Sequence, residues 1–307
     1  GADPNAGYLC MGLIPPFTAI TGFLGNSESD RPGYPGGSLA PARLLLEAGA
    51  DANDDQTLYN RQFGEDDSHF VLLFEFGLGG GDGGIWNERL GGRPDPPAKI
   101  LRTQLEWAIV HDMTARVALL VDHGVDFLAP YEREEWRIVD CGTSHGRTPA
   151  EVAALAGCDS VVELLVERGA VRPAREGVDG LIAAVLAGDQ PTVARLQGFA
   201  EQARTERPAL VVWAASRRKL DAIRQLVSEL GFDVNARGRT DVPFEQEWET
   251  SLHHAAGNGD IELVRLLLEL GADPDIEDGR FHSTPLGWAE HFDQGEMADL
   301  LRPLTAV

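Results

Sequence analysis

The sequence predicts an all-α fold, a solenoid of about eight stacked helix–turn–helix units. The first observation is a repeated phrase, ETSLHHAAGNGDIELVRLLLELGADPD, whose Thr250 recurs as Thr284, 34 residues later. The second is a helix-ending phrase that recurs along the chain, as LLLEAGAD from Leu44, LLVDHGVD from Leu119 and LLLELGAD from Leu266. Units of similar length that each carry an apolar stripe bury those stripes by stacking on their neighbours.

The start and the end of each helix pair are marked by particular residues. Thr148-Pro149 and Thr284-Pro285 are typical helix starts. The threonine hydroxyl can cap the first free N–H groups, and proline needs no donor at the first helical position. A leucine-rich second helix ends at a glycine such as Gly271, which tolerates the left-handed conformation.

This phrase resembles the ankyrin repeat, whose signature is T-P-L-H-x-A at a period of about 33 residues. The resemblance implies one ankyrin-repeat domain over residues 1–307, with hairpin or finger loops between its units. The expected repeats start near Pro15, Gln56, Thr103, Thr148, Asp179, Ala209, Thr250 and Thr284. Residues 1–6, GADPNA, match the end of a preceding repeat, so self-association through an uncovered N-terminal end is one expectation.

Four stretches are longer than the plain repeat, and such insertions form loops that often border the binding face. They span residues 26–38, 79–97, 130–146 and 237–249. The last three each carry one tryptophan, which is Trp86, Trp136 and Trp248 in turn. The insertions are therefore candidate contact loops.

Three further tryptophans share one repeat position, the x of T-P-L-H-x-A: Trp107, Trp213 and Trp288. In the family this position lies on the first helix, which lines the concave side, and aromatic anchors dominate binding energetics. His254 and His291 are expected on the same side in the last two repeats. These five side chains form a candidate binding face. The alternative is that the tryptophans only pack against the first helix of the neighbouring repeat.

The second repeat departs most from the pattern, because Arg61 stands where a small alanine is expected. A buried arginine is costly without a partner, so Arg61 should pair with Glu65, Asp66 or Asp67, or face a ligand. We expect the following loop to bring more polar and aromatic groups to the same side. The candidate pocket comprises Tyr59, Asn60, Arg61, Trp86 and Arg89.

The charge balance limits the choice of partner. The chain has 26 basic and 49 acidic residues, a net charge of −23, which repels phosphate backbones and excludes nucleic acid as a partner. Such a field either serves solubility or steers a basic protein or a cationic ligand to the surface. No run of about 18 apolar residues predicts a membrane span. Cys10, Cys141 and Cys158 form no disulfide framework or zinc pattern, which fits a reducing, cytoplasmic setting.

No residue pattern indicates catalysis, a metal site or a cofactor. The glycine stretch at residues 79–84 lacks the lysine of a phosphate-binding loop, and His254 with His291 matches no metal-ligand spacing. We therefore expect a protein–protein interaction scaffold, bacterial in composition, that binds a partner through its concave face and insertion loops. The alternative is a small-molecule-binding protein or an atypical enzyme with a pocket at repeats 2–3.

Overall fold

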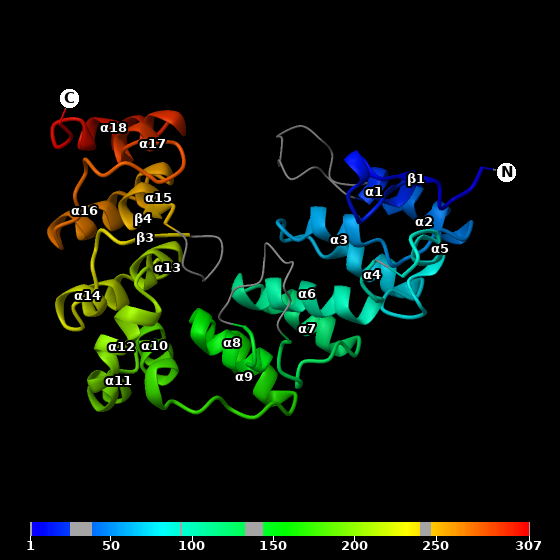
Figure 1. The fold of residues 1–307 in the computed structure, drawn as a ribbon, viewed down its shortest axis with the longest axis horizontal. Helices are drawn as coiled ribbons and strands as arrows, with labels where there is room; N and C mark the ends of the chain where they lie inside the picture. Colours follow the sequence, from blue (N-terminus) through cyan, green and yellow to red (C-terminus); the bar gives the residue numbers. More distant parts are fainter. Residues whose placement is uncertain (1, 25–38, 93, 133–143, 240–246, 307) are drawn as a thin grey trace. The chain divides into compact units, whose positions relative to one another are not determined.

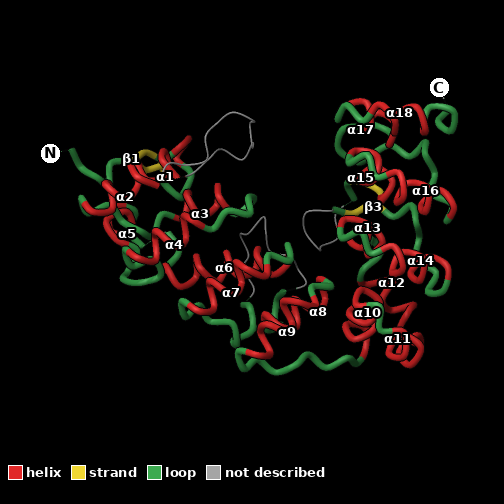
Figure 2. The backbone as a smooth tube through the Cα atoms, turned by 180° about the vertical axis from the view of Figure 1, so that it is seen from behind, coloured by secondary structure: helices red, strands yellow, loops and turns green. Residues whose placement is uncertain are grey.

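The computed structural model describes residues 2–24, 39–92, 94–132, 144–239 and 247–306. The chain divides into two compact units, Gly1–Phe127 and Leu128–Val307. Pairs of helices build both units, and the described strands are only two residues long (Figures 1 and 2). The predicted helical fold is thus confirmed. The insertion at residues 26–38 and Trp136 lie outside the described residues.

The first unit begins with a short hairpin, in which Gly7 pairs with Thr18 in antiparallel register. Helices follow in pairs, and the first helices of successive pairs contact one another, α1 with α3 and α3 with α6. Its described elements are β1 (Gly7–Tyr8), η1 (Cys10–Gly12), β2 (Phe17–Thr18), α1 (Ala19–Leu24), α2 (Leu39–Glu47), α3 (Asp55–Arg61), α4 (Ser68–Glu75), α5 (Gly84–Arg89), α6 (Pro97–Val110) and α7 (Thr114–Asp122).

The second unit repeats the same arrangement. Its described elements are α8 (Pro149–Ala156), α9 (Asp159–Glu167), α10 (Gly177–Ala187), α11 (Gln190–Leu196), η2 (Gln197–Phe199), α12 (Ala200–Glu206), α13 (Leu210–Ser216), α14 (Leu220–Ser228), β3 (Arg237–Gly238), β4 (Glu249–Thr250), α15 (Ser251–Gly257), α16 (Ile261–Glu269), α17 (Pro285–His291) and α18 (Gly295–Leu301). First helices again stack, α13 on α15 and α15 on α17. An antiparallel hairpin, β3 with β4, precedes α15, as expected for a finger loop. The extra turn formed by η2 and α12 follows α11, where the repeat pattern is degenerate.

Threonine hydroxyls cap the N-terminal ends of three helices at the positions that the sequence predicts. The Thr148 side chain accepts from the backbone N–H of Glu151, and the Glu151 carboxylate accepts in return from the backbone N–H of Thr148. Thr250 caps α15 in the same way, with His253 in the reciprocal role, whereas at α17 only the Thr284 hydroxyl accepts, from the backbone N–H of Gly287. Each cap satisfies donors that the first helical turn leaves without a partner.

The first helix of the third repeat, α6, begins earlier than the repeat pattern predicts. Thr103, expected near its start, lies inside α6, and its hydroxyl donates to the carbonyl of Lys99 at 3.0 Å. The helix begins at Pro97, because a proline at the first helical position sacrifices no hydrogen bond. With 14 residues α6 is the longest described helix. None of the described helices combines the length and apolar character that a bilayer span requires.

Replacing Thr148 by alanine is expected to lower the free energy of unfolding by about 0.5–2 kcal/mol, because both halves of the capping box are lost. Chemical denaturation of the two proteins measures the difference. Thr205→Ala is the control, since that exposed hydroxyl only donates to the carbonyl of Glu201 within its own helix. Equal losses in the two variants would contradict a capping role for Thr148.

Candidate functional site

The tryptophans at the shared repeat position pack within the stack. Trp107 and Trp213 are buried, and their indole N–H groups donate to the carbonyls of Gln62 (3.0 Å) and Ala156 (3.2 Å). Trp288 is half-buried and donates to the Asp278 carboxylate at 3.0 Å. Each indole thus has a partner in its own chain, and two of the three offer little surface to another protein. Their role as partner anchors stays a prediction.

Two predicted residues meet in one aromatic row. The Phe63 ring lies edge-on to both Tyr59 and Trp107, with ring centroids 5.6 and 5.1 Å apart, and His111 stacks on Trp107 at 3.8 Å. Phe63 is 46% exposed and was not singled out from the sequence, where it falls outside the repeat signature. The exposed part of this row belongs to Tyr59 and Phe63, rather than to the tryptophan.

The two histidines of the predicted face have different surroundings. His254 is half-buried on α15, and burial lowers its pKa. His291 ends α17, where its ring lies edge-on to Phe292 at 4.9 Å. Across the described residues no cluster of histidine, cysteine and carboxylate side chains has a metal-binding arrangement.

The structure divides the predicted pocket between two sets of contacts. Arg61 pairs with the Asp66 carboxylate, one of the three partners expected for it, and Asn60 accepts a hydrogen bond from Gln56 at 2.7 Å. Trp86, by contrast, donates to the carbonyl of Asn5 at 3.1 Å. The Arg89 guanidinium lies over the Trp86 ring, 5.0 Å from its centroid, and also donates to that carbonyl. These contacts hold α5 against the N-terminal segment.

A buried arginine that sequence reasoning missed lies in the same unit. Arg116 on α7 is 1% exposed, and its guanidinium donates to the Asp67 carboxylate (2.6 Å) and to the carbonyls of Gln62 (2.8 Å) and Gly64 (2.5 Å). Aligning the helix-ending phrases places Arg116 where other second helices have Val161 and Leu263. That mismatch is the signal that could have found it.

His69 lies beside this arginine and is fully buried. Burial, together with the nearby positive charges of Arg61 and Arg116, lowers its pKa to about 3. The imidazole is therefore neutral at physiological pH. Arg116 joins α7 to α4 in the core of the first unit, through Asp67 at the start of α4 and the Phe70 ring.

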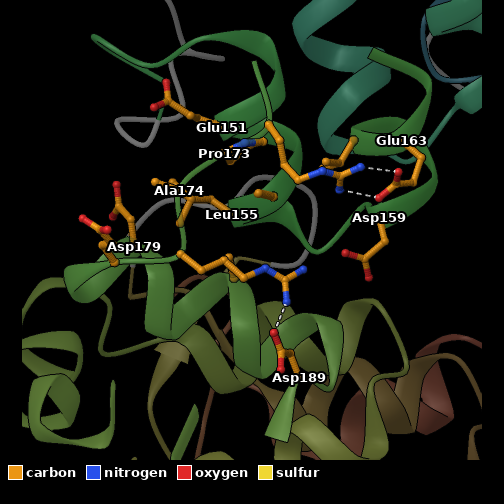
Figure 3. Close-up of a pocket in the computed structure, with 14 residues that line it drawn as sticks. Glu151, Leu155, Asp159, Glu163, Pro173, Ala174, Asp179 and Asp189 are labelled. Carbon is orange, nitrogen blue, oxygen red and sulfur yellow. Dashed lines mark hydrogen bonds and ion pairs between the residues drawn. The ribbon is translucent and has the colours of Figure 1, made fainter. Parts of the chain in front are cut away.

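The second unit contains a cleft of about 400 Å³ (Figure 3). It lies between the α8–α9 pair and α10, and the segment leading from α9 to α10 crosses it. Leu155, Val162 and Ala183 contribute an apolar lining. Six carboxylate side chains surround it: Glu151, Asp159, Glu163, Glu176, Asp179 and Asp189. Three arginines pair with three of these carboxylates, so the cleft keeps an excess of negative charge.

The two lining arginines hold carboxylates on different helices. Arg172 binds both oxygens of Glu163, each at 2.6 Å, and this hydrogen bonding lowers the Glu163 pKa. Arg175 pairs with Asp189, whose pKa is lowered by hydrogen bonds from Thr192 and then by Arg175. These carboxylates are therefore ionised at neutral pH.

On the opposite side of the cleft Asp179 pairs with Arg147, which forms two hydrogen bonds to it at 2.8 and 3.1 Å. Figure 3 shows Glu151 near this side, with Asp159 and Glu163 across the cleft. Sequence reasoning missed the cleft because part of its lining, residues 172–176, lies outside the repeat signature. The one available signal was the pair of arginines between two acidic helices.

The paired helices, with first helices that stack on one another, are those of a repeat solenoid. Comparison with known proteins identifies the type of repeat. Residues 181–278 match the ankyrin-repeat family, in three copies. Residues 181–278 therefore contain ankyrin repeats, within a mostly helical fold built from stacked helix pairs.

Several proteins are similar over part of the chain. Serine/threonine-protein kinase VIK of Arabidopsis thaliana is 36% identical over 102 residues, which is 33% of this chain and 22% of the kinase. Ankyrin repeat domain-containing protein 49 of Bos taurus is 38% identical over 64 residues, 21% of this chain and 24% of that protein. The chain thus spans about a quarter or less of the length of the curated relatives it matches. The crystal structure of the human ASB11 ankyrin repeat domain aligns with a TM-score of 0.35 and 22% identity, over 66% of this chain and 83% of that one.

Proposed function

We propose that the protein is an interaction module that binds another protein, and that the acidic cleft of the second unit receives a basic segment of that partner. The observation that carries the proposal is the ring of six carboxylates around a cleft of about 400 Å³. The first-helix face and the insertion loops remain part of the proposed binding surface.

The lining of the cleft suits a lysine or arginine side chain. Such side chains bury their methylene stems on apolar surface while the charged head stays among polar groups. Leu155 and Ala183 supply apolar surface beside the carboxylates of Asp159 and Asp179. The volume falls in the range of sites that enclose a ligand group, about 300–1,000 Å³.

The charge of the whole chain supports the same partner. A net charge of −23 raises the local concentration of basic molecules and speeds their encounter with the surface. Complementary charge of this kind mainly raises the association rate and excludes acidic partners. The electrostatic field of the whole chain attracts basic molecules without orienting them, and the cleft supplies the direct contacts.

A fluorescently labelled nona-arginine peptide is expected to bind the protein, and Asp159→Asn combined with Glu176→Gln is expected to weaken it about three- to tenfold. Removing two carboxylates from the cleft lowers the attraction for each guanidinium that enters it. Fluorescence anisotropy at low and moderate salt measures both affinities. A peptide of nine serines checks that the binding needs positive charge.

The matched control is Glu201→Gln combined with Glu296→Gln, which removes the same charge from exposed positions on α12 and α18. This control should change the affinity less than twofold. Equal weakening by the two double variants would mean that the peptide senses only the overall charge, and the cleft proposal would be rejected.

A further inference from the structure

The segment that crosses the acidic cleft is itself basic. Residues 171–176, VRPARE, here called the strap, connect α9 to α10 without helix or strand. Arg172 binds Glu163 on α9, and Arg175 binds Asp189 at the start of α11. The chain therefore places in the cleft the same guanidinium chemistry that the proposed partner would bring.

The second half of the strap is held tightly against α10. A Cβ atom added at Gly180 would lie 2.4 Å from the carbonyl carbon of Arg175, so this close approach requires glycine. The Arg195 guanidinium also donates to the carbonyl of Arg175 at 2.9 Å. Backbone packing and a side-chain hydrogen bond thus fix this half.

The first half of the strap has weaker attachments. Val171 is 87% exposed, and the side chains of Arg172 and Glu163 are 56% and 57% exposed. Water and salt screen an ion pair this exposed, so it holds its two side chains less strongly than a buried pair would. Arg172 can therefore leave Glu163 without disturbing the half of the strap that Gly180 and Arg195 hold.

Departure of Arg172 would leave two carboxylates together. Asp159 precedes Glu163 by four residues on α9, which places both side chains on one face of the helix. Like charges at this spacing repel each other, so a cation between them is favourable. Figure 3 shows the two carboxylates on the same side of the cleft.

We propose that Arg172 is an internal competitor, which occupies Glu163 until a basic residue of the partner replaces it. This inference rests on the proposed function, because it concerns the same cleft and the same class of partner. The strap thereby sets how strongly the cleft binds. A partner must exchange one guanidinium for another, and that exchange weakens its net affinity.

The test compares nona-arginine binding by the wild-type chain, Arg172→Gln and Arg302→Gln. Arg302 is also an exposed arginine paired with carboxylates, on the last helix, so its removal changes the net charge equally. We expect Arg172→Gln to tighten binding about two- to fivefold beyond Arg302→Gln. Circular dichroism checks that both variants keep their helices.

A second variant tests whether Glu163 is the carboxylate that the peptide gains. Adding Glu163→Gln to Arg172→Gln removes the carboxylate that the competitor occupied, so the extra tightening should disappear. Tightening that persists in this double variant would overturn the proposal.

The outcomes separate this inference from the proposed function. If the wild-type, Arg172→Gln and Arg302→Gln chains bind the peptide equally well, the competitor role of Arg172 is rejected, while the proposed function is decided by the Asp159→Asn and Glu176→Gln double variant. If only the Arg172→Gln chain binds the peptide, Arg172 blocks the cleft completely in the wild type, and the competitor role is supported. If none of the three binds, both proposals are rejected.

Discussion

Arg116→Ala is expected to lower the free energy of unfolding of the first unit by about 3–5 kcal/mol. The substitution removes a fully desolvated guanidinium and leaves its acceptors without it. The half-buried Asp67 carboxylate and the carbonyls of buried Gln62 and half-buried Gly64 then lose their donor. The Phe70 ring, 5.6 Å from the guanidinium carbon, also loses a neighbour.

Urea unfolding measures the loss, and hydrogen exchange of the α6 and α7 amides locates it in the first unit. Arg43→Ala is the matched control, because Arg43 pairs with Glu75 at the surface, where both side chains are nearly half exposed. An exposed pair contributes at most about 1 kcal/mol. A similar loss in both variants would show that the buried contacts of Arg116 are not special.

A second replacement separates volume from hydrogen bonding. Arg116→Leu installs the residue type that Leu263 provides at the equivalent position of α16. It fills the space but still leaves Asp67 and two carbonyls without their donor, so it should remain destabilising. A leucine variant as stable as the wild type would contradict the argument.

Repeat periodicity predicted the local features that one unit determines by itself. The hydroxyl caps at Thr148, Thr250 and Thr284 follow from residues within four positions of each other, and the structure has all three. The carboxylate partner of Arg61 was also predictable, because a poorly hydrated arginine needs a counter-charge and Asp66 is close in sequence.

Features that depend on neighbouring units were harder to predict. A repeat position places Trp107 and Trp213 on a first helix, but it does not say how much of each indole the adjacent helices cover. The acidic cleft depends on the path of residues 171–176, which follows no period and is held by Gly180 and Arg195. Sequence patterns of single units contain no information about such a path.

Acidification is the second large effect that we expect, and His69 is its source in the first unit. Its folded-state pKa of about 3 lies below the value of about 6.5 in an unfolded chain. Above about pH 6.5 both states are neutral, so the shift costs nothing. As the pH falls below that value, the imidazole is protonated in the unfolded chain but stays neutral in the folded chain. Stability is therefore lost progressively between about pH 6.5 and 3.

The expected loss from His69 alone is about 2 kcal/mol between pH 7 and pH 5, because the slope reaches its limit of about 1.4 kcal/mol per pH unit only well below pH 6.5. His69→Asn and His69→Phe remove the titrating group and should lose that part of the pH dependence, whatever they cost at pH 7. The measurement is the change in unfolding free energy between the two pH values for each protein. Carboxylates titrate in all three proteins, so the difference between wild type and variant isolates the imidazole. If the wild type and both variants lose the same stability on acidification, His69 is protonated within the folded unit, and Arg61 and Arg116 do not keep it neutral.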